Sequence, residues 1–268
     1  MKSKDLYPAI FSRHAAAYQS RLEQIMARGE AVGRQRVLEL VDAGPGMRVI
    51  DLACGPGTLT WRLAERVGPS GEVVGVDLAP GMIERARLAG IPNARFELMD
   101  IEELAFPDAT FDAGVCGHGL QFMPNLARAL SEARRVLRAG CPFGASVPAG
   151  PGQGQAVSKL LDSVLDRWLP AAPEAEDRVA TRATLLDPQA FRAVAIDAGF
   201  DSARVEVIEE SVRWESAEQL VALCTSWWDC AARLEGVDED RRQAFIDDAL
   251  VTLGRAHPGP IETTARNH

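Results

Sequence analysis

The stretch VIDLACGPGTLT, residues 49–60, joins an apolar run to a helical pattern through a turn of nearly bare backbone. Gly55 and Gly57 carry no Cβ, so the chain can turn sharply and a ligand can approach the backbone amides that open the following helix. The next apolar run, VVGVDL (73–78), places Asp77 near its carboxyl end. A carboxylate at that end of a strand is placed to accept hydrogen bonds from both hydroxyls of a ribose. The pattern predicts a nucleoside site, and capping of the next helix is a second possible role for Asp77.

The same turn lacks the features that bind a chain of phosphates. A dinucleotide fingerprint aligned on Gly55 and Gly57 requires a third glycine at position 60, where the sequence has Thr60. No lysine of the nucleoside triphosphatase type follows the turn. We therefore expect a nucleoside without a pyrophosphate.

The elements that must position these residues are short apolar runs separated by helical segments. The expected strands cover residues 48–53, 72–78, 94–100, 111–117 and 142–148, and the expected helices between them cover 58–67, 80–89 and 125–139. Near-continuous apolar runs are typical of a parallel sheet covered on both faces. The alternation predicts an α/β, Rossmann-like, doubly wound fold with right-handed crossovers, in which ligands bind at the carboxyl ends of the strands.

Four regions follow from this pattern. Residues 1–44 predict an N-terminal helical cap, and residues 45–148 predict the cofactor-binding core. Residues 149–186 open with a Gly/Pro-rich hinge and contain an amphipathic helix, which favours a helical lid inserted between sheet elements. Residues 187–268 predict a helix, an alternating strand at 203–214, further helices and a final segment, IETTARNH, that could complete the sheet.

Composition limits the partners. The chain has 268 residues, of which 47% are hydrophobic and 25% charged, as in a soluble globular protein. A net charge of -9 argues against nucleic acid or an anionic membrane as partner. No apolar stretch reaches the ~18 residues of a membrane span, and the first residues lack the apolar core of a secretion signal. We expect a cytoplasmic protein, a monomer or homodimer, that acts on a small molecule.

The five cysteines are widely spaced and include no C-x-x-C pair. This spacing favours buried apolar side chains over a disulfide framework, a zinc site or a catalytic thiol. No metal is expected.

Four segments within residues 45–148 carry a family resemblance: VIDLACGPG, VVGVDLAPGMIERAR, FELMDIEELAFPDATFDAGVCGHGLQFMPN and ARALSEARRVLRAGCPF. In order and spacing they resemble the class I S-adenosylmethionine-dependent methyltransferases, in particular the branch of ubiquinone and menaquinone C-methyltransferases and natural-product methyltransferases. The resemblance implies a mostly parallel sheet of seven strands, S-adenosylmethionine as cofactor and S-adenosylhomocysteine as product.

The resemblance also implies which residues contact the cofactor. Those at its amino-acid end are Asp51, Ala53, Gly55 and Gly57. Asp77 is implied at the ribose, and Leu78 and Met82 are implied against the adenine ring. Asp100 is implied at the adenine amine, with Ile101 beside it. Cys116 and Gly117 are implied next to the methionyl portion. The family often has glycine where this chain has Ala53.

Methyl transfer from a sulfonium depends mainly on alignment, and a base is needed only where the nucleophile holds a proton tightly. His118, directly after the fourth expected strand, is the candidate base, with a polar pocket wall as the alternative. Candidate substrate contacts, each with a structural role as the alternative, are His14, Tyr18, Gln121, Trp168 and Trp227.

We expect a methyltransferase that acts on the carbon, oxygen or nitrogen of a small apolar or cyclic molecule, quinone-like or a natural product. Two alternatives remain at this point. One is a cyclase of the same fold that retains the cofactor without transferring its methyl group. The other is a binding module that holds the cofactor without turnover.

Overall fold

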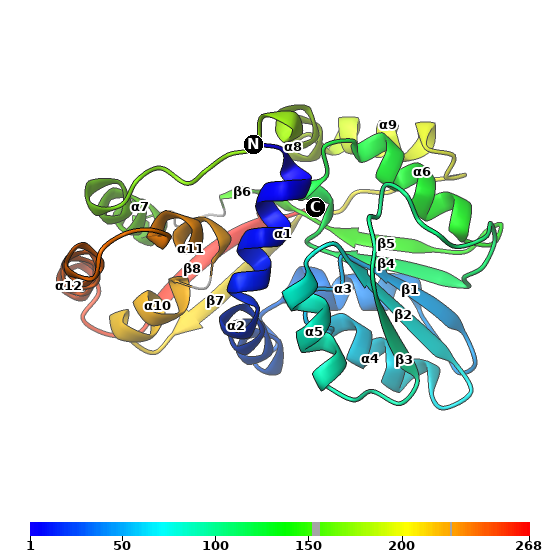
Figure 1. Ribbon diagram of the computed structural model, residues 1–268, viewed down its shortest axis with the longest axis horizontal. Helices are drawn as coiled ribbons and strands as arrows, with labels where there is room; N and C mark the ends of the chain where they lie inside the picture. The colour runs from blue at the N-terminus through cyan, green and yellow to red at the C-terminus, as the bar shows by residue number, and fades with distance from the viewer. Residues whose placement is uncertain (152–155, 226) are drawn as a thin grey trace.

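The computed structural model describes residues 1–151, 156–225 and 227–268. Three helices precede the first strand, as expected: α1 (Ser3–Arg13), α2 (Ala15–Ala27) and α3 (Val32–Val41). Figure 1 shows α1 standing between the central sheet and a group of later helices, so this helix is in contact with both halves of the molecule.

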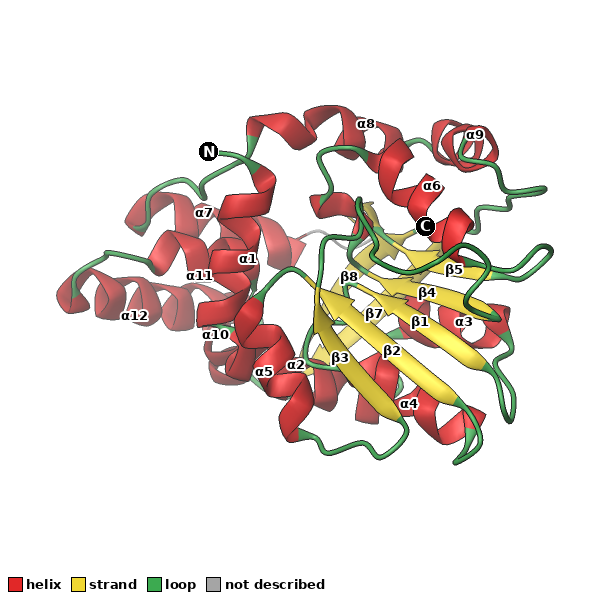
Figure 2. Ribbon diagram, turned by 45° about the vertical axis from the view of Figure 1, so that its right-hand side comes forward, coloured by secondary structure: helices red, strands yellow, loops and turns green. Residues whose placement is uncertain are grey.

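The central sheet has five parallel strands in the order β3-β2-β1-β4-β5 (Figure 2). Its strands are β1 (Arg48–Leu52), β2 (Glu72–Asp77), β3 (Ala94–Leu98), β4 (Ala113–Gly117) and β5 (Phe143–Ser146). The helices between them are α4 (Thr58–Val67), α5 (Pro80–Leu88) and α6 (Leu126–Val136), with a 3-10 turn η1 (Leu120–Phe122) before α6. The predicted Rossmann-like, doubly wound architecture is confirmed, and the strand order reverses between β1 and β4.

Alternate side chains of β1 bury in two different apolar clusters. Val49 packs with residues of α3 and α4, whereas Ile50 and Leu52 pack with residues of α6 on the opposite face. All three are fully buried. Because both faces of the strand are covered, the sequence is an almost continuous apolar run, as in other parallel sheets.

The expectation of seven strands in one sheet is wrong. The central sheet has five, and a separate antiparallel sheet has the order β6-β8-β7. Its strands are β6 (Pro148–Pro151), β7 (Ile208–Trp214) and β8 (Ile261–Asn267), so IETTARNH does form a strand. The chain passes from β5 into β6 through Val147, whose backbone exchanges two hydrogen bonds of 2.9 Å with His268. Proline at 148 offers no amide donor to the ladder, and the register of β6 against β8 shifts between Pro148 and Gly150.

The remaining helices are α7 (Ala156–Trp168), η2 (Glu176–Arg178), α8 (Val179–Leu186), α9 (Pro188–Asp197), α10 (Ala217–Cys224), α11 (Trp228–Leu234) and α12 (Glu239–Ala256). Four of them, α7, α10, α11 and α12, gather on one side of β7 and β8 (Figure 1). The packing of α7 on α12 places the predicted amphipathic helix within this group. Of the Gly/Pro-rich hinge expected from residue 149, residues 152–155 lie outside the described part of the chain.

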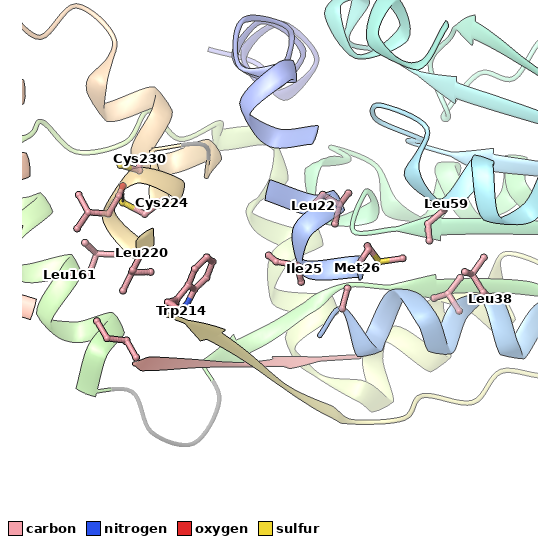
Figure 3. Packing of buried hydrophobic residues seen from close by; sticks show 14 of the residues in the cluster. Leu22, Ile25, Met26, Leu38, Leu59, Leu161, Trp214, Leu220, Cys224 and Cys230 are labelled. Atoms are coloured by element: carbon pink, nitrogen blue, oxygen red, sulfur yellow. Dashed lines mark hydrogen bonds between the residues drawn. The ribbon is translucent and has the colours of Figure 1, made fainter. Parts of the chain in front are cut away.

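One apolar cluster connects the two halves. It runs from Leu38 and Leu59 beside the central sheet, through α2, to Trp214 and the helices around Leu161 (Figure 3). The Trp214 ring is buried, and its Nε1 donates to Thr263 Oγ1 at 2.8 Å. All five cysteines are free, and four are buried, in keeping with the expected apolar role.

Within the described ranges, none of the helices combines the length and the apolar character that crossing a bilayer requires.

Candidate active site

A cavity opens where β1, β2 and β4 end, and α1 forms part of its wall. Most of the residues predicted to contact the cofactor line it: Asp51, Ala53, Gly55, Asp77, Leu78, Met82, Asp100, Ile101 and Gly117. Gly57 and Cys116 adjoin it without lining it. The structure therefore brings together side chains from four separate segments at one edge of the sheet.

The glycine turn after β1 is held by Asp77. The Asp77 carboxylate accepts the Gly55 amide at 2.9 Å on Oδ2 and the Ala79 amide at 2.8 Å on Oδ1. Gly55 and Gly57 have φ angles of 55° and 84°, which favour glycine. Asp77 thus fixes the turn and also binds the amide of Ala79, the N-cap residue of α5.

Ala53 precedes this turn with a φ of 53°, a left-handed conformation that costs energy for alanine. Its methyl group points toward Gly119 after β4. A Cβ built on Gly119 would lie 2.4 Å from the Ala53 Cβ and 2.8 Å from the Cys116 Sγ. The family often has glycine at position 53. This chain has room for the Ala53 methyl group because residue 119 is glycine and carries no Cβ.

Asp51 is a buried carboxylate that is only half satisfied. The Thr60 hydroxyl donates to its Oδ2 at 2.7 Å, but among the described residues its buried Oδ1 has no partner. Burial raises the pKa of Asp51 to about 7, helped by the nearby Asp77 charge and opposed by Thr60 and Arg34. A cation at Oδ1 would supply the missing partner and favour the ionised form.

Asp100 is paired with the helix that covers it. Lys4 Nζ of α1 lies 2.6 Å from Asp100 Oδ2 and 2.7 Å from Glu102 Oε2. The neighbouring Ser3 donates through its hydroxyl to Asp177 Oδ1 at 2.6 Å. The first turn of α1 is thus tied both to the segment after β3 and to η2.

His118 has both ring nitrogens in hydrogen bonds. Its Nδ1 is 3.0 Å from Ser146 Oγ on β5, and its Nε2 is 3.0 Å from Asn267 Oδ1 on β8. With the Asn267 carbonyl as acceptor, Nε2 carries the hydrogen and Nδ1 accepts from the serine. Burial, together with the charges of Arg34 and Arg21, lowers the pKa of His118 well below its usual value. The imidazole is therefore neutral, and taking up a proton at Nδ1 requires the Ser146 hydroxyl to turn from donor to acceptor.

A second cavity adjoins the first and shares several of its lining residues, which are Phe11, Tyr18, Arg34, His118 and Phe122. Gln121 and Trp227, both predicted substrate contacts, line only the second cavity. The Gln121 amide donates to the His118 carbonyl at 2.8 Å. The two cavities thus meet around the His118 ring and the Tyr18 side chain.

Two of the predicted substrate contacts line neither cavity. Trp168 Nε1 donates to Asp248 Oδ2 of α12 at 2.8 Å, which places the indole in the outer helical group. His14 ends α1, and its Nε2 is 3.5 Å from a carboxylate oxygen of Glu235.

Sequence reasoning missed several polar residues that the fold brings to the two cavities or into contact with their walls. They are Lys4, Arg21, Arg34, Ser146 and Asn267. The spacing of Tyr18 and Arg21, three apart on one helix, would have indicated a shared face. Within residues 1–151, 156–225 and 227–268, no group of three or more His, Cys, Asp or Glu side chains could hold a metal.

The chain is similar to known methyltransferases. A family model described as a methyltransferase domain matches residues 49–140. The nocamycin O-methyltransferase of Saccharothrix syringae is 32% identical over 248 residues, which cover 86% of each chain. A 2-phytyl-1,4-naphtoquinone methyltransferase of Trichormus variabilis is 33% identical over 135 residues, 48% of this chain and 59% of that protein.

Three of the curated relatives are matched over only part of their length, from 36% to 59%. The crystal structure of the YcgJ protein from Bacillus subtilis superposes with a TM-score of 0.52 at 16% identity, covering 88% of this chain and 94% of that one. This likeness shows a shared fold. Because the nocamycin enzyme aligns with the chain nearly from end to end, and the matching domain contains the glycine turn and Asp77, the chain belongs to the class I S-adenosylmethionine-dependent methyltransferases.

Proposed function

We propose that this protein transfers a methyl group from S-adenosylmethionine to a small cyclic acceptor held in the second cavity. The observation that carries the proposal is the Oδ1 of Asp51, which is buried in the wall of the first cavity beside the glycine turn and has no partner among the described residues. When bound, the cofactor supplies a methyl group already activated on a sulfonium. The residues of the chain then have to bind, orient and exclude water.

The cofactor fits the groups that the first cavity offers. Asp51 Oδ1 would accept the ammonium of the amino-acid end. Each Asp77 oxygen accepts one backbone amide and keeps lone-pair capacity for a ribose hydroxyl. Leu78, Met82 and Ile101 offer apolar surface to the adenine, whose amine Asp100 would accept.

The second cavity suits a flat ring. Its aromatic walls come from Tyr18, Phe122, Trp227 and Trp228 on three different segments. Relatives named for a naphthoquinone and for nocamycin support a cyclic acceptor. We assign His118 to the shared wall as a neutral group that orients the acceptor, because Ser146 and Asn267 already occupy both of its ring nitrogens.

The test combines binding and turnover. S-adenosylhomocysteine should bind by calorimetry, and methyl-labelled cofactor with a metabolite extract should yield a labelled small product. Asp77→Ala should weaken cofactor binding by ~1.5–3 kcal/mol through the lost hydrogen bonds. Asp248→Ala, on the distant α12, should bind like the parent protein. Cofactor binding without a methylated product from any accepted molecule would reject the proposal.

A further inference from the structure

Arg21 of α2 and Arg34 of α3 line the second cavity without an acidic partner. Among the described residues, neither guanidinium forms an ion pair with a carboxylate. Arg34 donates to the Tyr18 hydroxyl at 3.3 Å, and Arg21 lies over the Tyr18 and Trp227 rings at 5.3 and 5.9 Å. The protein therefore keeps two unneutralised cations beside its candidate acceptor.

The other arginines of this cavity differ, because each has a carboxylate. Arg182 lies 3.0 Å from Glu174 and Arg178 lies 3.4 Å from the same residue. Arg233 lies 2.7 Å from Asp166. A further carboxylate of the lining, Asp229, accepts the Cys230 amide at 2.8 Å. Among the described residues, the arginines of this cavity that lack a carboxylate partner are thus those on the side formed by α2 and α3.

In the described part of the chain, buried donors without acceptors occur on both sides of the second cavity, at Arg178 Nε and Arg233 Nε as well as on the side of α2. Arg21 Nε and Trp227 Nε1 are both buried and have no hydrogen-bond partner among the described residues. A buried donor left unpaired costs about 1–3 kcal/mol, which an acceptor oxygen of a ligand would remove. Burial also lowers the pKa of Arg21 to about 10, a sign that its charge lacks a counterion.

We propose that Arg21 and Arg34 bind an oxyanion of the acceptor, so that the substrates are cyclic molecules carrying a carboxylate or an acidic enol. This rests on the methyltransferase function proposed above. Arg34 lines both cavities, which places the anion near the cofactor end. An acceptor bound as its anion needs no base, in agreement with a His118 whose ring nitrogens are both occupied.

The test uses small ring probes on protein saturated with S-adenosylhomocysteine. By calorimetry, 2-naphthoate and 4-hydroxycoumarin, the carboxylate and enol arms, are compared with neutral 2-naphthamide. At least one anion should bind ~10-fold or more tightly than the amide, because hydrogen bonds to charged groups contribute about 1.5–3 kcal/mol. The anion that binds more tightly shows whether the acceptor's oxyanion is a carboxylate or an enolate. Equal binding of all three probes, or no binding of either anion, overturns the proposal.

Variants separate charge from folding. Arg21→Gln should abolish the preference for anions, Arg21→Lys should keep most of it, and Arg167→Gln, on α7 outside both cavities, should leave it unchanged. An Arg21→Gln protein that melts normally and keeps the preference also overturns the proposal. Methyl transfer is assayed separately with labelled cofactor. A preserved anion preference without any transfer would reject the proposed function while supporting the anion site.

Discussion

Asp51 makes cofactor binding depend on pH. In the free protein its pKa is raised to about 7, above the ordinary value, so the folded chain holds a proton there at mildly acidic pH. The free energy of unfolding that the protein gains by holding this proton on Asp51 is complete at low pH and is lost as the pH rises through 7. A cofactor ammonium at Oδ1 would favour the ionised form. Cofactor binding therefore has to expel that proton when the pH is below 7.

We predict that the affinity for S-adenosylhomocysteine rises by up to about tenfold per pH unit toward pH 7 and then levels off. Calorimetry in buffers of different ionisation enthalpy should show proton release below pH 7. The Asp51→Asn variant should bind more weakly and lose both effects. The same slope in Asp51→Asn would show that another group is responsible.

The contact between positions 53 and 119 can be tested by a double-mutant cycle. Gly119→Ala should destabilise the protein by about 1–3 kcal/mol, because its Cβ overlaps the Ala53 methyl group. Adding Ala53→Gly should recover part of that loss, since one of the two overlapping atoms disappears. Urea denaturation of the two single variants and the double variant gives the coupling. Simple additivity would contradict the proposed accommodation.

At the residue scale, what could be predicted was local in sequence. The glycine turn and the carboxylates at strand ends follow from their neighbours along the chain, because parallel strands deliver their ends to one edge. Arg21, Arg34 and Asn267 could not be assigned this way. Arg21 and Arg34 reach the second cavity from helices whose position depends on packing. Asn267 reaches the His118 wall in the same way, from 149 residues along the chain.

Among the elements, α1 is both wall and cover of the first cavity. Lys4 ties it to Asp100 and Glu102, and Arg13, at the other end, pairs with Glu235 at 2.7 Å. An exit route for the cofactor past this helix would require the first of these ties to break. Partly exposed ion pairs of this kind contribute roughly 0.2–1 kcal/mol.

We predict that Lys4→Ala speeds the release of S-adenosylhomocysteine by about 1.5- to 5-fold, the range that this energy allows. Stopped-flow displacement gives the rate, and hydrogen exchange should show weaker protection in α1. Lys159→Ala, on α7, is the matched control. An unchanged release rate with faster exchange in α1 would mean that the cofactor leaves by another route.

Element boundaries show where local patterns lose their value. The apolar spacing predicted a helix over 125–139, but α6 ends at Val136. There Leu137 bridges to Phe111, and the Arg138 amide donates to the Phe111 carbonyl at 3.0 Å, which draws the chain out of the helix. The sheet count failed for a similar reason. Whether β6 and β8 extend the central sheet depends on pairing across the molecule, which periodicity does not encode.

For the molecule as a whole, cofactor binding should appear as thermal stability. Ligand at 100 times its Kd stabilises the folded state by about 2.7 kcal/mol, which raises the Tm of a chain of this size by roughly 5–10 °C. Differential scanning calorimetry with S-adenosylhomocysteine should show this shift, and NAD should give none. A shift with NAD alone would contradict the assignment of the first cavity. The expected cytoplasmic location and monomeric or dimeric state remain predictions, as does the lid role of residues 149–186.

The bond between His118 and Asn267 sets an order of assembly. The glycine turn, Asp77 and Asp100 all precede β8 along the chain, so they are synthesised before it. Because domains generally fold as units, His118 gains its Asn267 partner only once β8 has been made. This tie in the acceptor wall therefore comes from a strand that is synthesised after every residue expected to hold the donor.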